Sequence, residues 1–495
     1  MNKKADARIA LFCLIAAAAV LLICSMNSYL YPINPWNDVN CFMTVAREML
    51  AGKVPYLDLI EQKGPLLYGL HALALTVSPG NYHGMYWIET LLMAGALFFF
   101  HKTARLYAPR INVGWTAVAA MVICVSRAFR YGDSAEQLCL FPVAWSMYAA
   151  LKSMRANERI SMKGYLLHGA LAGCILWVKF NLLGFHLVWM GFLAIDALIA
   201  HRTLKRPVCM CLWFLGGMAL ASVPWLIYFG ANGALDDLLS VYFGMNIGQY
   251  GPRRYNFLLY TGAGLMRCLQ DPVLAMPLMA TALGVLFAPR RWIGWREKGF
   301  LVCAFGVMAV AIYGMGMRYV YYFMVFAVFL PLAALAVRAL SGLVCRGKIC
   351  RHAGMRAAVC GLLLAVGIGG ALRLSANAAW IGYPYEETLQ GKVAALLKEE
   401  KRPTIINAGE LDGGFYFAAD AQIGSKWFCE LNVDREGCLA DHQRCMDEGR
   451  TDYVITIGET LEEIGLKSDW PLVAQVESDY GGPEKTARIY GKPED

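Results

Sequence analysis

Residues 36–67, which read WNDVNCFMTVAREMLAGKVPYLDLIEQKGPLL, form the longest polar interruption in the first third of a very apolar chain. Apolar runs stand on both sides of this stretch, and charged side chains add nothing to a hydrophobic core. The stretch is therefore either a solvated connector or a functional site held against a bilayer, and the features below favour a site. Its charged residues are Asp38, Arg47, Glu48, Lys53, Asp58, Glu61 and Lys63.

The composition predicts a polytopic α-helical membrane protein. Of the 495 residues, 58% are hydrophobic and only 17% are charged, whereas soluble domains average about 25% charged residues. A helix of about 18 or more apolar residues spans the roughly 30 Å hydrocarbon core of a bilayer, and several runs reach that length. The net charge of +8 is spread over short clusters between these runs, a pattern that gives no support to nucleic-acid binding.

About eleven apolar segments are expected to cross the membrane. The first, residues 9–25, could instead be a cleaved signal peptide, but its length and the lack of a small-residue cleavage site favour an uncleaved helix. Residues 66–77 and 257–269 are too short to assign, so whether they cross is left open. The other ten segments are residues 85–101, 111–126, 138–151, 165–179, 182–200, 208–229, 272–288, 300–316, 319–337 and 355–372.

The loop charges orient these segments in the plasma or inner membrane. Basic loops alternate with mixed or acidic loops, and basic loops remain in the cytoplasm. The N-terminus is therefore predicted in the cytoplasm. Residues 27–65 and the C-terminal part are predicted on the outer side. The basic clusters lie in residues 102–110, 152–163, 202–206, 290–298 and 346–351.

The last part of the chain reads as a small α/β domain. Short apolar runs typical of strands alternate there with helical stretches. We therefore divide the chain into a transmembrane domain, residues 1–376, in which the outer loop 27–65 carries the candidate site, and an extracytoplasmic α/β domain, residues 377–495. The expected strands are 404–408, 453–457, 472–476 and 487–490, and the expected helices are 394–400 and 437–449.

Two residues of the opening stretch have both a structural and a functional interpretation. Apolar side chains between Val39 and Leu50 recur at helical spacing, which predicts an amphipathic helix on the membrane surface. Asp38 stands at its start and is either an N-cap, a role that Asp fills well, or a working carboxylate. Lys63 precedes the next apolar segment and is either a snorkelling anchor or a ligand for a lipid phosphate.

A second charged cluster, SRAFRYGDSAEQ at residues 126–137, is predicted on the same side of the membrane. Its charges are spaced by three, so a helical turn would bring them towards one face. Two arginines beside two acids suit a phosphate, a diphosphate or a shared metal ion, although a loop with local ion pairs fits as well. The four residues are Arg127, Arg130, Asp133 and Glu136.

Outward basic residues run against the positive-inside bias, which makes Lys179 and Arg318 further candidates for contact with an anion. No GxxxxGK[ST] motif is present, so ATP-driven transport has no support. No CxxC pair is present, so the sequence indicates no zinc or redox framework. The remaining site candidates are Glu48, Asp58, Glu61, Glu136 and Lys179.

With these residues in view, the chain resembles the GT-C superfamily of membrane glycosyltransferases, within it the protein O-mannosyltransferase and aminoarabinose transferase group, which is family 39-like. In that group the first outer loop carries an acidic motif, an amphipathic helix and a Lys-Pro-Pro-like turn. The matching motifs lie in residues 1–150, and the rest is similar in architecture. They are Asn37 and Asp38 at the acidic motif, residues 46–50 in the helix, residues 62–66 at the turn, and residues 131–133 at a second acidic site.

The resemblance implies an inverting transfer of a sugar from a polyprenyl-phosphate donor to an extracytoplasmic lipid, envelope glycan or protein. Asp38 would be the general base and Asp133 the second carboxylate. No cofactor is certain, and a magnesium or manganese ion shared by these two residues is left open, since Asn37 replaces an acid. The residues expected to hold the carrier phosphate are Lys63, Arg127, Arg130 and Arg318.

Two alternatives come from other functional classes. A lipid-carrier flippase or transporter without chemistry would place polar groups near the bilayer midplane on broken helices, whereas here acids and bases gather at the predicted outer surface. An envelope sensor or assembly protein would bind ligands through the C-terminal domain. The sequence identifies neither the sugar, the acceptor nor the oligomeric state.

Overall fold

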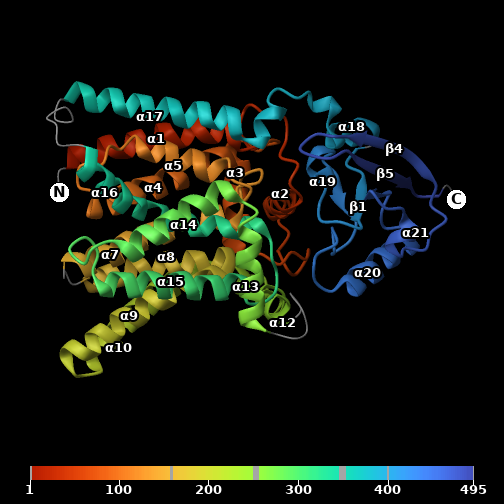
Figure 1. The fold of residues 1–495 in the computed structure, drawn as a ribbon. Helices are drawn as coiled ribbons and strands as arrows, with labels where there is room; N and C mark the ends of the chain where they lie inside the picture. The colour runs from red at the N-terminus through yellow and green to blue at the C-terminus, as the bar shows by residue number, and fades with distance from the viewer. Residues whose placement is uncertain (1–2, 157–159, 249–255, 345–352, 399–400, 494–495) are drawn as a thin grey trace. The chain divides into compact units, whose positions relative to one another are not determined.

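The computed structural model describes residues 3–156, 160–248, 256–344, 353–398 and 401–493. The chain forms two compact units, each assembled from separate segments of sequence (Figure 1). Unit 1 comprises Met1–Ser25, Tyr86–Pro224 and Gly251–Ala378, and unit 2 comprises Met26–Met85, Trp225–Tyr250 and Ala379–Asp495. Residues 27–65, predicted to form the first outer loop, thus belong to the same unit as the C-terminal α/β region. The division of the chain at residue 376 into a membrane domain and an outer domain stays a prediction.

Unit 1 is helical because its apolar segments have no polar environment to satisfy backbone groups, and a helix satisfies them internally. Its helices coincide with most of the predicted segments. Those lying wholly or mostly in unit 1 are α1 (Lys3–Cys24), α4 (His83–Tyr107), α5 (Trp115–Cys124), α6 (Ala135–Leu138), α7 (Leu140–Ala156), α8 (Met162–Lys179), η1 (Phe180–Leu183), α9 (Gly184–His201), α10 (Lys205–Ala231), α13 (Phe257–Cys268), α14 (Pro272–Phe287), α15 (Trp295–Tyr313), η3 (Val320–Ala333), α16 (Ala334–Val344), α17 (Ala353–Leu374) and η5 (Ala376–Trp380).

Within the described residues, five helices are long and apolar enough to cross a membrane, or six if α13 and α14 form one span bent by 112°. One of the five is the 39-residue stretch Met162–Ala200. The hydroxyl of Ser146 lies 3.0 Å from His168 Nδ1 and 2.9 Å from His186 Nε2. A straight helix would separate these histidines by about 27 Å, so the chain reverses at η1, and α8 and α9 are two antiparallel helices, as predicted. The total of eleven crossings remains a prediction.

Unit 2 combines the first outer loop with a five-stranded sheet. Its strands run in the order β2-β1-β3-β5-β4; β1 pairs in parallel with β2 and β3, and β5 pairs antiparallel with β3 and β4. Its elements are α2 (Asn37–Leu50), α3 (Pro65–Val77), α11 (Leu235–Asp237), η2 (Leu238–Met245), α12 (Asn246–Gly248), η6 (Tyr385–Glu387), α18 (Leu389–Leu397), β1 (Thr404–Ala408), α19 (Phe415–Ala418), β2 (Gln422–Ile423), α20 (Arg435–Asp447), β3 (Tyr453–Ile457), α21 (Leu461–Ile464), β4 (Leu472–Ser478) and β5 (Lys485–Gly491).

The sheet has its own hydrophobic core. Ile406 of β1 and Val454 of β3 pack with Cys445 and Met446 of α20 and with Ile464 of α21, and all five are buried. The predicted strands over residues 404–408 and 453–457 are confirmed with the same bounds. Parallel strands joined through a packed helix make this region an α/β fold, as the sequence predicts.

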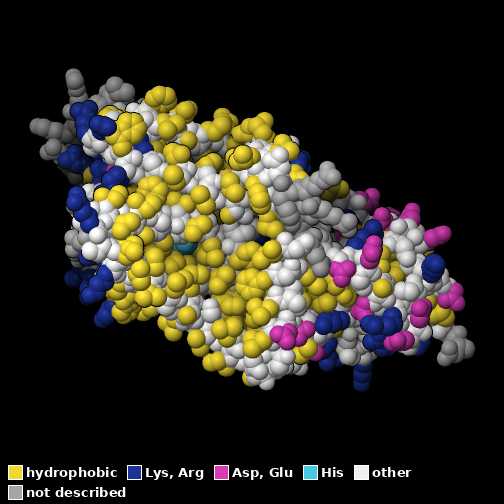
Figure 2. All heavy atoms as spheres, turned by 90° about the horizontal axis from the view of Figure 1, so that it is seen from below, with side chains coloured by type: hydrophobic (Ala, Val, Ile, Leu, Met, Phe, Trp, Pro, Cys, Tyr) yellow, Lys and Arg dark blue, Asp and Glu magenta, His cyan; other side chains and the backbone are white. Residues whose placement is uncertain are grey.

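The surface of the helical part is mostly hydrophobic and is basic at one end. In Figure 2, hydrophobic side chains cover much of the helical part, and Lys and Arg gather at the end of the helices where the N-terminus lies. Near the start of α15, four cations lie close to the rings of Trp292, which precedes the helix, and Trp295, which begins it. The pairs are Arg290 and Lys298 with Trp295, and Arg291 and Arg338 with Trp292.

Candidate active site

Asp38 lies in the first turn of α2 but does not cap it. The helix begins at Asn37, and its N-cap, Trp36, has extended backbone and no side-chain cap hydrogen bond. The interpretation of Asp38 as an N-cap is therefore wrong. Its side chain is partly exposed, and within the described residues it has no hydrogen bond or ion pair. A negative charge is favoured in the first turn of a helix. The helix therefore holds this carboxylate in place, although the carboxylate makes no structural bond within the described residues.

The polar face of α2 is buried inside unit 2, whereas the sequence predicted that it would face water. The hydroxyl of Thr44 donates a 2.6 Å hydrogen bond to Asp412, and Tyr82 donates one of 2.7 Å to Asn40. The side chain of Asn37 donates to Glu410 at 3.0 Å. These bonds, rather than a membrane surface alone, determine how α2 and the neighbouring Asp38 are held.

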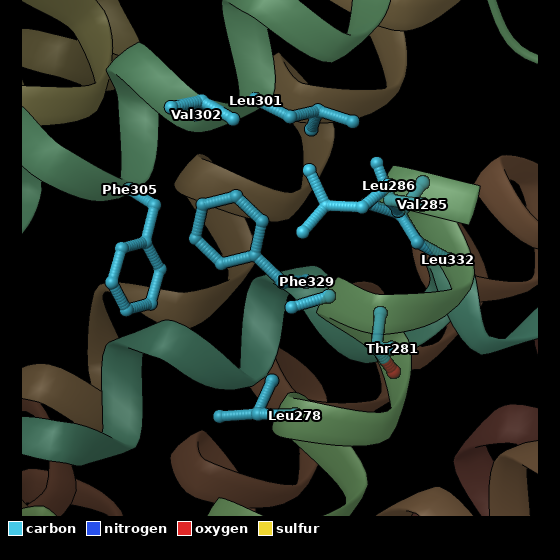
Figure 3. A pocket seen from close by; sticks show the side chains of 10 residues that line it. Leu278, Thr281, Val285, Leu286, Leu301, Val302, Phe305, Phe329 and Leu332 are labelled. Carbon is cyan, nitrogen blue, oxygen red and sulfur yellow. The ribbon is translucent and has the colours of Figure 1, made fainter. Parts of the chain in front are cut away.

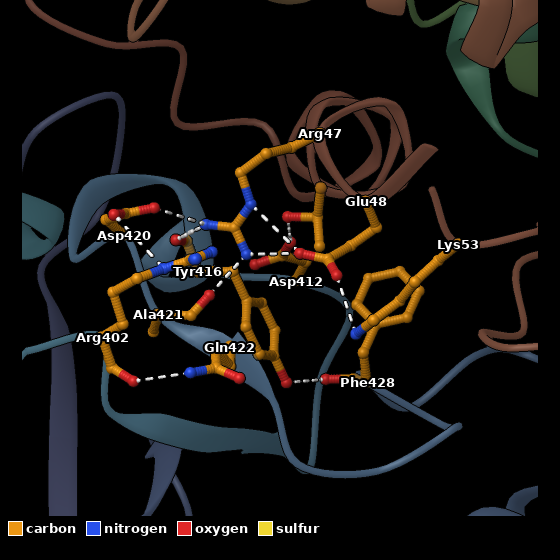
Figure 4. Close-up of polar contacts among 11 residues, drawn as sticks. Arg47, Glu48, Lys53, Arg402, Asp412, Tyr416, Asp420, Ala421, Gln422 and Phe428 are labelled. Atoms are coloured by element: carbon orange, nitrogen blue, oxygen red, sulfur yellow. Dashed lines mark hydrogen bonds and ion pairs between the residues drawn. The ribbon is translucent and has the colours of Figure 1, made fainter. Parts of the chain in front are cut away.

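An ion-pair network fixes the end of α2 (Figure 4). Arg47 donates to the backbone carbonyls of Tyr416 and Ala421 and pairs with Glu48 at 2.8 Å. Glu48 also pairs with Lys53 at 2.8 Å. Burial alone would raise the pKa of Glu48, but the bonds from Lys53 and Arg47 outweigh it and hold this pKa below its ordinary value. Glu48, predicted as a site candidate, thus has a structural role in this network.

Asp412 should make the stability of unit 2 depend on pH. Burial raises its pKa to about 6, although bonds from Thr44 and Gly414 oppose the shift. Because the folded-state pKa is above the ordinary value of 3.8, this group stabilises the fold at low pH and loses that contribution as the pH rises through about 6. A change of about two pKa units corresponds to roughly 3 kcal/mol.

Asp412→Asn removes this titration and keeps an acceptor for Thr44. We expect the melting temperature of the full-length variant in detergent, relative to wild type, to rise between pH 4 and pH 7. Asp420→Asn is the matched control, because the side chain of Asp420 is 71% exposed. Parallel pH profiles for Asp412→Asn and wild type would contradict this interpretation of the buried carboxyl group.

Lys63 is held in an aromatic and acidic surrounding by a tightly bonded turn. Its side chain is 12% exposed, with the ammonium 3.6 Å from Glu61 and 5.7 Å from the ring centre of Phe42. The Lys63 amide donates to Glu61 at 2.7 Å, and the hydroxyls of Tyr56 and Tyr68 donate to the Lys63 carbonyl. Direct charge-assisted bonds measure about 2.7–2.9 Å, so the 3.6 Å contact with Glu61 is an ion pair longer than a direct charge-assisted bond.

The other acids of this loop shape the backbone. Asp58 is exposed, and its carboxylate accepts a 2.6 Å hydrogen bond from the Val54 amide, which closes a turn. Glu61 is almost fully buried and is bonded to the turn that carries Lys63. Both were predicted as site candidates, and their contacts assign them to positioning the loop.

Asp133 belongs to unit 1, and the buried carboxylate of Glu89 holds its loop in place. Glu89 of α4 accepts hydrogen bonds of 2.8 Å from the Asp133 amide, from Gln137 and from the Ser25 hydroxyl. Asp133 is itself fully buried and has φ +66°, and Gly132 before it has φ +91°. Backbone held in this region by surrounding bonds is typical of functional loops.

The predicted single face of residues 126–137 is wrong. The loop is a series of turns with positive φ values, so it does not continue a helix. Arg127 and Arg130 are exposed, whereas Asp133 and Glu136 are buried. The cluster therefore does not present its arginines and acids together.

Glu136 instead pairs with Lys179, another predicted candidate. Their charged atoms lie 2.6 Å apart, and the Lys179 ammonium lies 3.7 Å from the ring centre of Tyr322. Arg318 is exposed near the ring of Tyr260, at 5.9 Å. Of the residues predicted to hold a phosphate, Lys63 thus lies in unit 2, and the arginines lie in unit 1.

Sequence reasoning missed three buried acids, which are Glu89, Asp271 and Asp412. Asp271 stands at the break between α13 and α14 and accepts a 2.9 Å hydrogen bond from the Ala128 amide. Its other oxygen is buried without a hydrogen-bond partner in the described residues. A lone acid within or beside an apolar segment is itself a signal for a functional residue, and that signal was available for Glu89 and Asp271.

Within the described residues, no group of three or more His, Cys, Asp or Glu side chains could hold a metal ion. Asp38 and Asp133, the two ligands left open from the sequence, belong to different units. A metal shared by these two carboxylates therefore stays a prediction.

An apolar cavity of about 190 Å³ lies in unit 1 between α14, α15 and η3 (Figure 3). Thr281 is the one hydroxyl-bearing residue in its lining, so the cavity suits a hydrocarbon chain better than a sugar. The side chains that line it include Leu278, Val285, Leu301, Phe305, Phe329 and Leu332.

Comparison with known proteins supports the fold. No family model matches the chain, and no curated protein matches it in sequence. Two solved structures match over almost the whole length, ArnT from Cupriavidus metallidurans in the apo state and the same protein bound to undecaprenyl phosphate. The apo structure has 12% identity and a TM-score of 0.59, and the bound structure has 13% identity and a TM-score of 0.60; each match covers 98% of both chains.

The chain has the ArnT fold. The mostly helical fold with a small C-terminal sheet that the sequence predicted agrees with this match. The ArnT fold extends through the C-terminal region, where the sequence resemblance rested on architecture alone. At such low identity the comparison establishes fold and membrane character, and the roles of individual residues must come from their chemistry.

Proposed function

We propose that this protein is a membrane glycosyltransferase that transfers a sugar from a polyprenyl-phosphate carrier to an acceptor outside the cytoplasm. The observation that carries the proposal is the ArnT fold over 98% of both chains, found also in the structure that binds undecaprenyl phosphate. An integral membrane protein with this fold and an apolar cavity is suited to a lipid-linked donor. Nucleotide sugars are cytoplasmic, so a lipid-linked donor also fits outer charged loops.

The orientation is part of the same proposal. Lys and Arg gather at the end of the helices that carries the N-terminus (Figure 2), which is the distribution expected of cytoplasmic loops. We infer that the first outer loop and the α/β sheet of unit 2 lie on the opposite side, in the cell envelope. Acceptors there include lipids, envelope glycans and proteins.

The chemistry we propose is an inverting single displacement. Asp38 removes the proton from the acceptor hydroxyl as the oxygen attacks the anomeric carbon. The bond from that carbon to the carrier phosphate breaks, and the phosphate leaves as an anion that Lys63 stabilises. Arg127, Arg130 and Arg318 stay proposed as further cations for the phosphate, and all three are exposed in unit 1. Asp133 remains the proposed second carboxylate.

Lys63→Ala should weaken the binding of undecaprenyl phosphate to the full-length protein in detergent by about tenfold to a hundredfold. A charge-assisted bond shielded from water contributes roughly 1.5–3 kcal/mol, and about 1.4 kcal/mol is a factor of ten. Lys53→Ala, in the same loop but 38% exposed and paired with Glu48, is the matched control. Equal affinity in wild type and Lys63→Ala would show that Lys63 does not bind the phosphate and is only a snorkelling anchor.

The function itself is tested by the products. Mass spectrometry of envelope lipids, glycans and proteins should reveal a glycan that is present in cells with the protein and absent without it. Purified protein with a polyprenyl-phosphate sugar should release the carrier phosphate when the acceptor is added. Movement of the donor across vesicles without release of phosphate would instead indicate a flippase.

A further inference from the structure

Two cysteines from distant parts of the chain meet inside unit 2. Cys41 lies in α2, and Cys429 follows β2 in the C-terminal region. Their sulfur atoms are 3.6 Å apart, and the residues are 1% and 0% exposed. Cys41 lies on the same helix as Asp38 and Thr44, and neither cysteine has a part in the proposed chemistry.

The bonds around the pair show that this proximity is built into the fold. One turn after Cys41, Thr44 donates to Asp412 at 2.6 Å. Next to Cys429, the Glu430 amide donates to the Glu410 carbonyl at 3.0 Å, and the Tyr416 hydroxyl donates to the Phe428 carbonyl. Both segments are therefore bonded to the same stretch of chain, residues 410–416.

The geometry allows a covalent link. Cysteine sulfurs in a disulfide are about 2.05 Å apart, so these two need to approach by about 1.5 Å. A sulfur lies about 1.8 Å from its Cβ, so rotation about the Cα–Cβ bonds moves the sulfurs by distances of this order. Cys445 is also fully buried in the same region, but it packs among Ile406, Val454 and Ile464.

We propose that Cys41 and Cys429 form a disulfide that joins α2 to the C-terminal α/β region. This inference rests on the proposed outward orientation, because disulfides persist in oxidising compartments such as the bacterial periplasm and the cell surface. The two thiols lose two protons and two electrons as the sulfur–sulfur bond forms. A disulfide-bearing thiol oxidant of the envelope accepts them and is reduced to two thiols.

The bond forms as the chain folds, not as a switch in the finished protein. Burial raises the pKa of both thiols, and exchange requires the thiolate form together with access for the oxidant. Once the pair is enclosed, both oxidation and reduction are slow. The disulfide is therefore a stable cross-link that holds α2, the helix that carries the proposed general base.

The test uses the full-length protein taken from cells by acid quenching, unfolded, and alkylated with N-ethylmaleimide before any reduction. Peptide mass spectrometry should find Cys41 joined to Cys429 in most molecules. Cys41→Ser should leave Cys429 alkylated, and Cys445→Ser, the matched control, should keep the cross-link. Alkylation of both Cys41 and Cys429 in wild type, or a link from Cys429 to Cys438, would overturn the proposal.

A second measurement separates this inference from the proposed function. The protein is unfolded, reduced and refolded, and its melting temperature is compared with that of the untreated protein. This treatment should lower the melting temperature of wild type by several degrees but leave that of Cys41→Ser unchanged. Equal melting temperatures of treated and untreated wild type would contradict a stabilising disulfide. Both readouts are independent of sugar transfer. A C-terminal tag that an impermeant reagent reaches only after lysis would overturn the proposed orientation, and with it both the proposed side of the acceptor and the envelope disulfide. Loss of the cross-link with the tag accessible on intact cells would overturn the disulfide alone and leave the proposed function standing.

Discussion

Asp38→Asn should lower the rate of sugar transfer by about 10²- to 10⁴-fold, the usual contribution of a general base. The side chain keeps its shape and loses only its ability to accept a proton. Because Asp38 does not cap α2, the structural cost is limited to its charge in the first turn, about 0.3–1 kcal/mol. Single-turnover transfer by the purified, full-length variant with saturating donor measures the effect.

The matched control for this variant is Glu436→Gln. Glu436 is an exposed acid in the first turn of α20, so its replacement also removes a first-turn charge. We expect unchanged transfer in that variant. A near wild-type rate in folded, membrane-inserted Asp38→Asn would exclude Asp38 as the base and direct attention to the buried acids of unit 1.

Lys179→Met should be the most destabilising of these substitutions, by about 3–5 kcal/mol, because it leaves a charge buried without its partner. Glu136 is 1% exposed, and its pair with Lys179 is only 2.6 Å long. The substitution also removes the cation from the ring of Tyr322. A melting curve in detergent, with the fraction of monodisperse protein as a second readout, measures the loss.

The double variant Lys179→Met/Glu136→Gln is the decisive comparison. Removing the second charge should recover most of the stability, because a buried ion pair contributes little net free energy beyond its own desolvation cost. Arg318→Met removes an exposed cation of unit 1 and should change stability by less than about 1 kcal/mol. Additive losses in the double variant would show that the pair is not coupled.

The sequence predicted the regular parts of the fold well because their signals are local. β1 and β3 are short runs of β-branched residues, and both were located with the same bounds as in the structure. β2 has two residues and owes its existence to pairing with β1, which no local pattern reveals. α18 begins earlier than predicted, at Leu389, because Thr388 caps it through the Gly391 amide, a signal that was available and overlooked.

The candidate site was predicted less completely because burial decides its chemistry. Asp38, Lys63 and Asp133 stand out in sequence as charges in polar loops. Glu89 is a single acid in an apolar helix, and only the fold brings Ser25 and Gln137 to its oxygens. The exposed arginines of residues 126–137 were grouped with the acids because of their spacing in the sequence. Such spacing predicts a shared face only in a helix, whereas this loop turns through positive φ angles.

The interleaved composition of unit 2 has a consequence for biogenesis. Residues 26–85 leave the ribosome roughly 300 residues before the segment beginning at Ala379, which is about 15 to 60 s at ordinary rates of synthesis. During that time α2 emerges without Asp412, Glu410 or the carbonyls that receive Arg47, so Thr44, Asn37 and Arg47 lack these partners. With the proposed orientation, this loop therefore stays incomplete in the cell envelope, accessible to chaperones and proteases there, until the last segment of the chain joins it.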